Sequence, residues 1–163
     1  MSKPALLSRR TTSRSAGRSH RAIRLASLTA LALAFAASTA LAAHLALTLG
    51  STSNATLGEH VIVSSQGRTL YTLSPETSKH LLCKGECLGF WPPLTVGSAK
   101  TKLKNGPGVQ GRLGLLRRSN GTFQVTLRGM PLYRYSKDRA KGETNGQGIE
   151  SFGGTWHAAT ASS

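Results

Sequence analysis

The pattern of apolar and polar residues changes character along this chain. Residues 25–43 carry no charge and consist mainly of Ala, Leu, Ser and Thr. Residues 44–58 are also uncharged but include Ser, Thr, Gly and Asn, and we interpret them as a linker. From residue 59 onward, short apolar runs alternate with turn residues, and no long helical period appears. The pattern therefore predicts a small all-β domain over residues 59–159.

A hairpin is predicted in each half of this domain. Residues 61–63 and 70–73 flank Ser-Ser-Gln-Gly, in which Gly67 can adopt the positive φ of a tight turn. Residues 113–117 and 123–127 flank an Asn-Gly pair, a strong hairpin signal.

The second hairpin is predicted to continue into a meander. A turn at Gly129 would bring residues 131–135 alongside as a third strand. The apolar and polar alternation in residues 123–127 predicts one buried and one solvent-facing side for that strand.

One aromatic motif occurs twice, which indicates two related β-hairpin or meander repeats with Gly-rich loops, over residues 59–96 and 111–159. Each copy contains Gly, then Leu-Tyr, an apolar residue two positions later, an acid three positions after that, and finally a Trp. Neighbouring strand residues point to opposite faces, so we expect Leu70 and Tyr71 on opposite sides of the sheet. The motif residues to which we assign structural roles are Tyr71, Glu76, Trp91, Tyr133, Tyr135, Asp138 and Trp156.

Those roles follow from ordinary side-chain chemistry. Each Trp is expected to cap the core, with its indole N–H bound to a carbonyl at the edge. Each acid is expected to accept backbone N–H groups from the loop that follows it. An aromatic ligand platform is the functional alternative.

The N-terminal segment has the organisation of an export signal. The first 24 residues hold seven Lys or Arg and no acid, and the apolar segment ends in Ala-Leu-Ala-Ala. A basic start, an apolar stretch and small residues are the three parts of a secretory signal. We expect residues 1–43 to be a signal peptide, with an uncleaved signal anchor as the alternative because 19 uncharged residues can span a bilayer.

The net charge predicts the partners. The whole chain has a formal net charge of +15, and beyond residue 43 there remain 14 basic and 6 acidic side chains. This balance favours adhesion to polyanions such as anionic envelope polymers or lipid head groups. Export makes nucleic acid an unexpected partner.

Cys83 and Cys87 are the two cysteines of the chain. In an oxidising compartment a single pair favours a disulfide, which would shape the loop before Trp91. The alternative is a metal or redox site in which His80, Cys83 and Cys87 are joined by His157 or Met130. The spacing of the cysteines is not that of zinc ribbons or thioredoxin-like proteins.

The common signatures of enzymes are missing from the sequence. There is no Gly-x-Ser-x-Gly motif, and the Gly-rich residues 142–148 lack the Gly-Lys-Ser/Thr ending of a P-loop. The six acids allow carboxylate pairs without favouring any one of them. We therefore expect a non-enzymatic domain that requires no cofactor.

Several motifs together resemble a known family. Leu-Tyr-Thr-Leu-Ser-Pro-Glu (70–76), Cys-Lys-Gly-Glu-Cys (83–87), Trp-Pro-Pro-Leu (91–94), Leu-Tyr-Arg-Tyr-Ser-Lys-Asp (132–138) and Gly-Gly-Thr-Trp-His (153–157) are similar to the bacterial secreted repeat found in predicted lipoproteins with a Y-x-[FWY]-x-x-D motif. The first copy departs from this motif at Leu73 and Glu76. The resemblance implies a bacterial envelope protein and no particular activity.

The sequence also bears on attachment and on function. No cysteine borders the apolar segment, so a lipid anchor is not expected. We expect a protein that acts outside the cell or on the outer face of the cytoplasmic membrane. The expected function is binding or scaffolding at the cell surface, and the alternative is a metal-binding or electron-transfer accessory domain.

Overall fold

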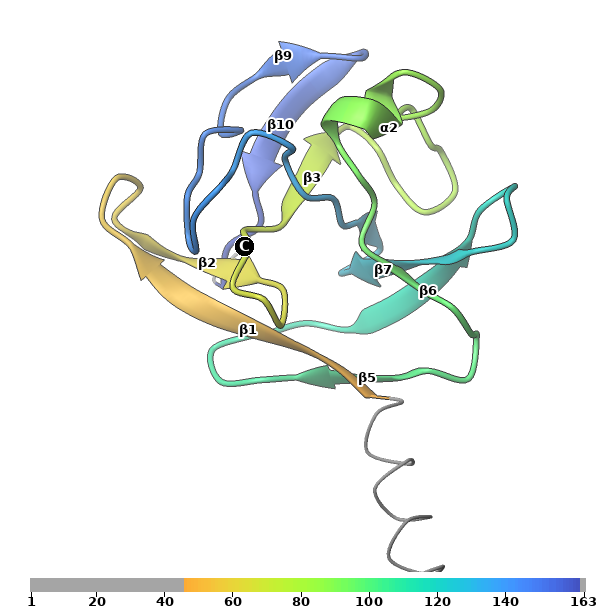
Figure 1. The fold of residues 1–163 in the computed structure, drawn as a ribbon, viewed down its shortest axis with the longest axis horizontal. Helices are drawn as coiled ribbons and strands as arrows, with labels where there is room; N and C mark the ends of the chain where they lie inside the picture. Colours follow the sequence, from red (N-terminus) through yellow and green to blue (C-terminus); the bar gives the residue numbers. More distant parts are fainter. Residues whose placement is uncertain (1–45, 162–163) are drawn as a thin grey trace, which may run out of the picture. The chain divides into compact units, whose positions relative to one another are not determined.

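The computed structural model describes residues 46–161, which fold almost entirely into strands and turns (Figure 1). In chain order the elements are β1 (Ala46–Asn54), β2 (Glu59–Val63), β3 (Tyr71–Ser74), α2 (Cys87–Phe90), β4 (Thr95–Val96), β5 (Lys102–Asn105), β6 (Leu113–Arg117), β7 (Phe123–Leu127), β8 (Met130–Pro131), β9 (Glu150–Ser151) and β10 (Gly154–Ala158). The predicted all-β fold is confirmed.

The strands form three small sheets. Their strand orders are β2-β1-β5, β3-β10-β9 and β4-β7-β6, and β8 also pairs with β7. The β1–β5 pair is parallel, and the other strand pairs are antiparallel. Figure 1 shows the β2-β1-β5 sheet on one side of the domain and β3, β10 and β9 on the opposite side.

The linker predicted for residues 44–58 is wrong over Ala46–Asn54, because these residues form β1, the central strand of its sheet. Leu49 is fully buried, and the Asn54 side-chain amide donates to the Gly142 carbonyl at 2.9 Å. Small polar residues resemble a linker in composition. Here they form a strand because β2 and β5 supply hydrogen-bond partners on both edges.

The predicted meander is confirmed in its order of strands, but the third strand, expected over residues 131–135, is limited to β8 because Tyr133 pairs with Tyr71 instead. β6 and β7 pair antiparallel, and the chain reverses where the Arg118 N–H donates to the Thr122 carbonyl at 2.9 Å. β8 then returns along β7 through a two-residue turn at Arg128-Gly129, with φ values of 53° and 82°. Positive φ at both central residues is typical of the type I′ turns that join hairpin strands.

The first predicted hairpin forms only in part. The chain turns tightly after β2, with the Gly67 N–H donating to the Ser64 carbonyl at 2.8 Å. Beyond this turn β2 pairs with β1, whereas β3 leaves to pair with β10. Strand partners far away in the sequence therefore replace most of the local hairpin.

The prediction of one solvent-facing side for β7 is wrong. Four of its five residues are buried, and Gln124 has no exposed surface. Both edges of β7 are paired, and the polar side chain of Gln124 has hydrogen-bond partners inside the domain. The Gln124 amide, for example, donates to the Leu132 carbonyl at 2.8 Å.

The core consists of two clusters on opposite sides of the Leu-Tyr strands. Leu70 and Leu132 lie in one cluster, and Tyr71 and Tyr133 lie in the other. Leu73 lies in the same cluster as Tyr71. The predicted separation of Leu70 and Tyr71 by strand alternation is thus confirmed.

The two copies of the motif interlock. The Tyr71 N–H donates to the Tyr133 carbonyl at 2.8 Å, and the Tyr133 N–H donates to the Tyr71 carbonyl at 2.9 Å. β3 of the first copy pairs with β10, which carries the Trp of the second copy. Reciprocally, the Arg134 N–H of the second copy donates to the Pro92 carbonyl of the first at 2.9 Å. Each Trp segment therefore pairs with the Tyr segment of the other copy.

Candidate functional site

The aromatic residues of the motif meet at the centre of the domain. Trp91 and Trp156 are stacked, and Tyr135 stacks on Trp91 with ring centroids 4.3 Å apart. Tyr71 meets Trp91 edge-on at 5.3 Å, and Tyr133 meets Trp156 edge-on at 5.2 Å. Both Trp rings are at most 1% exposed, so they cannot serve as a platform for a ligand.

The predicted capping role of the Trp residues is wrong. Both rings lie inside the core, and the indole N–H of Trp156 donates to the Ser151 hydroxyl at 3.1 Å instead of to a carbonyl. Stacking the two rings on each other buries more apolar surface than placing each at an edge.

The two acids hold the loops that follow them, as predicted. One Glu76 oxygen accepts the backbone N–H groups of Leu82 and Cys83, at 2.8 Å and 3.0 Å. One Asp138 oxygen accepts the backbone N–H of Asn145 at 3.1 Å. The two loops are therefore fixed in an equivalent way.

The acids also face the tyrosines of the opposite copy. The Tyr71 hydroxyl donates to the second oxygen of Asp138 at 2.7 Å. Burial is the main cause that raises the pKa of Tyr71, and Asp138 raises it further. Burial also raises the pKa of Asp138, although its hydrogen bond with Tyr71 acts in the opposite direction.

The equivalent pair of Tyr133 and Glu76 lacks this hydrogen bond. The Tyr133 hydroxyl and the second oxygen of Glu76 are buried, and neither makes a hydrogen bond of standard geometry. Burial, followed by the charge of Glu76, raises the pKa of Tyr133 to about 12.

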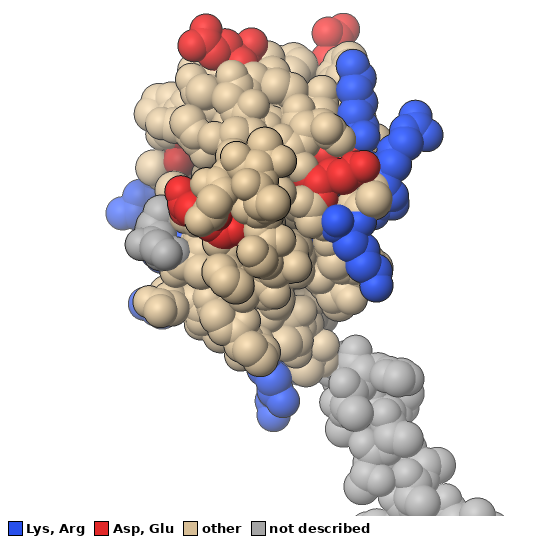
Figure 2. Space-filling model, turned by 90° about the vertical axis from the view of Figure 1, so that its left-hand side faces the viewer, with Lys and Arg blue, Asp and Glu red and all other residues tan. Residues whose placement is uncertain are grey.

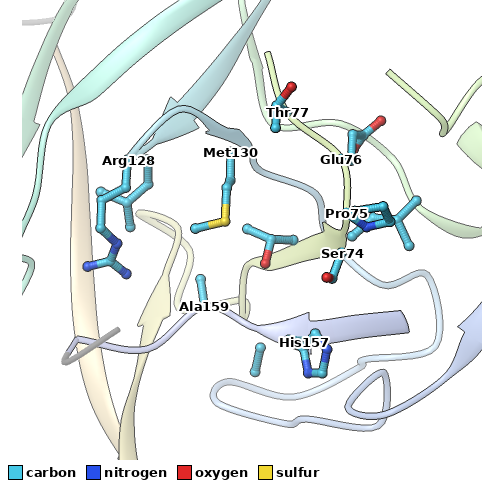
Figure 3. A pocket seen from close by; sticks show the side chains of 12 residues that line it. Ser74, Pro75, Glu76, Thr77, Arg128, Met130, His157 and Ala159 are labelled. Atoms are coloured by element: carbon cyan, nitrogen blue, oxygen red, sulfur yellow. The ribbon is translucent and has the colours of Figure 1, made fainter. Parts of the chain in front are cut away.

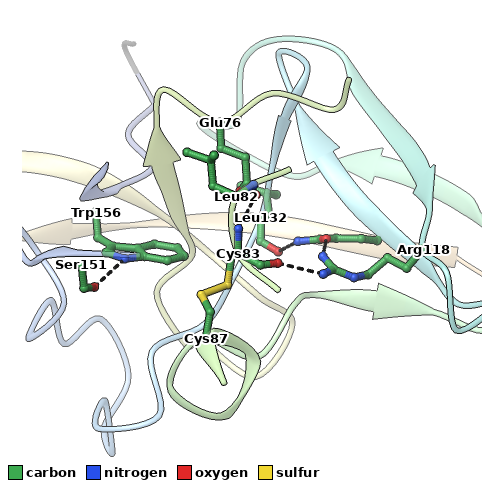
Figure 4. Close-up of a disulfide and its surroundings, with 9 residues drawn as sticks. Glu76, Leu82, Cys83, Cys87, Arg118, Leu132, Ser151 and Trp156 are labelled. Carbon is green, nitrogen blue, oxygen red and sulfur yellow. Dashed lines mark hydrogen bonds between the residues drawn. A yellow bond between two sulfur atoms is a disulfide. The ribbon is translucent and has the colours of Figure 1, made fainter. Parts of the chain in front are cut away.

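A buried arginine, Arg118, links β7 to the disulfide, and the sequence did not indicate this role. Arg118 is 8% exposed, and its guanidinium donates to the Gln124 side chain and, at 3.0 Å, to the Cys83 carbonyl. Figure 4 shows Arg118 reaching this carbonyl from the side of the disulfide opposite to Trp156. Cys83 and Cys87 form the predicted disulfide, with their Cα atoms 5.3 Å apart.

The alternative metal set is not assembled. The disulfide removes both thiolates as ligands, and His80 and His157 are exposed whereas Cys83 and Cys87 are buried. Within residues 46–161, no three His, Cys, Asp or Glu side chains are grouped so that they could hold a metal ion.

A cleft of about 440 Å³, which we name the wide cleft, lies beside β3 and β10. Figure 3 shows Met130 pointing into it, with His157 on the opposite wall. Its lining includes one acid, Glu76, and one arginine, Arg128, and apart from His157 the other lining residues are uncharged. The Arg128 guanidinium donates to the carbonyls of Gln110 and Thr160, at 3.1 Å and 2.9 Å.

A smaller cleft of about 210 Å³ occupies the equivalent position in the second copy, and we name it the basic cleft. Its lining residues are Arg68, Thr69, Pro92, Arg134, Tyr135, Ser136 and Asp138. Arg134 and Ser136 are exposed, and Thr69 is fully buried with no hydrogen-bond partner for its hydroxyl. Asp138 is 7% exposed and keeps its negative charge, so the two arginines and this one acid give the lining a formal net charge of +1.

The two clefts differ in charge at matching positions of the repeat. Where the wide cleft has Thr72 and Met130, the basic cleft has Arg134 and Arg68. Comparison of the two copies in the sequence could have singled out these arginines. The motif residues that stand out in the sequence of both copies, the tyrosines and tryptophans, form the core instead.

Further positive charge adjoins the basic cleft. Lys137, Arg139 and Lys141 follow Arg134 in the chain, and all are exposed. Asp138 lies within this segment and is buried, and Glu143 is the next acid along the chain. Its pKa is lowered mainly by the backbone N–H groups of Ala140 and Arg139, with smaller contributions from Arg68 and Arg139 charges. Figure 2 shows several Lys and Arg side chains along the right-hand edge of the view, with an acidic side chain among them and further basic side chains at the left and at the bottom.

The export signal or anchor predicted for residues 1–43 lies outside the described residues. Within residues 46–161, no helix has the length and apolar character needed to cross a membrane.

Comparison with known proteins gives one match. Residues 114–160 match the model of a family described as a secreted repeat of unknown function. This segment corresponds closely to the second copy of the motif, so the predicted resemblance is confirmed there, and the match supports export. No curated protein and no solved structure shows a significant match to the chain.

Proposed function

We propose that this protein is a non-enzymatic domain that binds anionic polymers of the cell envelope through the basic cleft. The supporting observation is the difference between two equivalent clefts: the basic cleft has two arginines to one acid in its lining, whereas the wide cleft has one arginine to one acid. Arg134 is the exposed cation of the basic cleft, and Arg68 is half-buried with its guanidinium donating to the Asp138 carbonyl. Exposed cations on a rigid scaffold attract polyanions and raise their local concentration.

The neighbouring segment extends this surface. Lys137, Arg139 and Lys141 are exposed beside the cleft, so a polymer longer than the cleft would meet further cations. The backbone around them is anchored, because the Gly142 N–H donates to the Gly67 carbonyl at 3.0 Å. A fixed row of charges loses less conformational entropy on binding than a mobile tail does.

The test is the affinity of the purified full chain for polygalacturonate and for polyphosphate across a salt series. The variant Arg134→Ser/Lys137→Ser removes two exposed charges at the cleft, and Lys102→Ser/Lys104→Ser removes two from β5. We expect the first variant to bind about fivefold or more weakly and the second to bind within about twofold of the native protein. Affinity should also fall as salt rises.

Two results would contradict the proposal. Equal losses in both variants would show a general charge effect without a site. Binding that does not respond to salt would show that the cations are not responsible.

A further inference from the structure

Two exposed aromatic rings lie side by side on the surface. Phe90 is 51% exposed and Phe152 is 38% exposed, and they are the exposed large hydrophobic residues among residues 46–161. Their ring centroids are 6.2 Å apart, with the planes tilted by 35°. Phe90 ends α2, and Phe152 lies in the β9–β10 turn, so elements of both copies build the pair.

The backbone at Phe152 is strained for an aromatic residue. Its φ is 53°, and with Gly153 at 86° it forms a two-residue turn that favours Asn or Gly at the first position. A bulky residue with positive φ is unusual because its Cβ crowds the backbone. Arg128 has the same positive φ, and its guanidinium makes two hydrogen bonds to backbone carbonyls. The Phe152 ring instead lies against Phe90 and is 38% exposed.

The aromatic pair borders the basic cleft. The Ser136 N–H donates to the Phe90 carbonyl at 2.9 Å, and Ser136 lines the basic cleft. Arg134 makes the next hydrogen bond along the same ladder, to the Pro92 carbonyl. The backbone of Phe90 therefore lies against that of Ser136, which places the aromatic pair next to a residue that lines the basic cleft.

We infer that this surface binds an anionic glycan, whose sugar ring stacks on Phe90 and Phe152 while its carboxylate or phosphate group enters the basic cleft. The inference rests on the proposed function and adds the chemistry of the ligand. The C–H face of a pyranose packs well on an aromatic ring, and the arginines provide the charge complementarity. A polyphosphate lacks the ring, and a neutral glucan lacks the charge.

The experiment compares three polymers: polygalacturonate, polyphosphate of matched charge density, and neutral dextran. The variants of the full chain are Phe90→Ala/Phe152→Ala and, as the conservative control, Phe90→Tyr/Phe152→Tyr. We expect the Ala pair to weaken binding of polygalacturonate about fivefold or more and to leave polyphosphate binding unchanged. The Tyr pair should bind polygalacturonate as the native protein does.

Thermal unfolding of each variant is the check on folding, because both rings are exposed and their removal should leave the melting temperature nearly unchanged. An equal effect of the Ala pair on both anionic polymers, or no effect on either, would overturn the inference while leaving the proposed function in place. So would tight dextran binding, or a change in oligomeric state with unaltered polygalacturonate affinity. Failure of every anionic polymer to bind would instead remove the proposed function itself.

Discussion

Trp91 and Trp156, one from each copy of the motif, stack with ring centroids 3.8 Å apart and planes within 4° of parallel. This contact joins the two copies at the centre of the domain, and both rings are almost fully buried. We therefore expect neither copy to be stable alone, since each Trp ring is covered by the other copy.

Truncation of one ring should strongly destabilise the fold. We expect Trp156→Ala to lower the free energy of unfolding by about 3–5 kcal/mol, because it leaves a large cavity beside Trp91 and Tyr133. Trp156→Phe should cost clearly less because it retains a stacked ring. Urea unfolding followed by circular dichroism measures both, and a loss below about 1 kcal/mol for the Ala variant would contradict the central role of the stack.

The two buried tyrosine hydroxyls should differ in their contribution to stability. Tyr71→Phe removes the 2.7 Å hydrogen bond to Asp138 and leaves a buried carboxylate oxygen unpaired. We expect a cost of about 1–3 kcal/mol. Tyr133→Phe should be close to neutral because the Tyr133 hydroxyl makes no standard hydrogen bond. Equal costs in urea unfolding would show that the two sites are energetically alike.

Stability should fall in alkaline solution. The folded-state pKa of Tyr133 is about 12, and that of Tyr71 is also raised, whereas an unfolded tyrosine has a pKa of about 10. The contribution of these protonated groups is complete below the unfolded pKa and is lost as pH rises through the folded pKa. Urea midpoints measured between about pH 9 and pH 11 should decline, and Tyr71→Phe/Tyr133→Phe should flatten the decline. An unchanged slope in the double variant would refute this explanation.

Gly146 should not tolerate a side chain. An added Cβ would lie 2.6 Å from Trp91 Cη2 and 2.9 Å from Tyr71 Cε1, atoms that the packed core holds in place. We expect Gly146→Ala to cost about 1–3 kcal/mol. Gly97 has no atom within 4 Å of an added Cβ, so Gly97→Ala is the matched control and should be nearly neutral in the same thermal or urea experiment.

Reduction of the disulfide should weaken the fold without abolishing it. Cys83 and Cys87 are four positions apart, so the constraint on the unfolded chain contributes about 2 kcal/mol. The loop keeps other anchors, because Glu76 accepts the Cys83 N–H and Arg118 donates to the Cys83 carbonyl. Urea unfolding with and without dithiothreitol measures the effect, and the variant Cys83→Ala/Cys87→Ala should not respond to the reductant.

Local patterns predicted the parts of the fold that depend on neighbouring residues. The Asn-Gly turn between β6 and β7 and the turn at Gly129 follow from backbone preferences, and both are present. Strand alternation correctly placed Leu70 and Tyr71 on opposite faces. Composition failed at Ala46–Asn54, because a strand of small polar residues is stabilised by partners that the sequence does not reveal.

The candidate site shows the same division. The doubled motif was visible in the sequence, but its most prominent residues are the buried core. The basic cleft depends on Arg68 and Arg134, which are 66 positions apart and meet only after the two copies interlock. Phe90 and Phe152 likewise come together from different copies.

The sequence by itself determined the strand-rich character of the domain, its internal repeat, its excess of positive charge and its pair of cysteines. These properties follow from side-chain periodicity, composition and local backbone preference. The tertiary structure decided that each Trp segment pairs with the other copy, that the tyrosines face the opposite acids, and that one of two equivalent clefts is cationic. Such pairings are chosen by the burial of the whole core and by hydrogen bonding between distant strands, which no short stretch of sequence specifies.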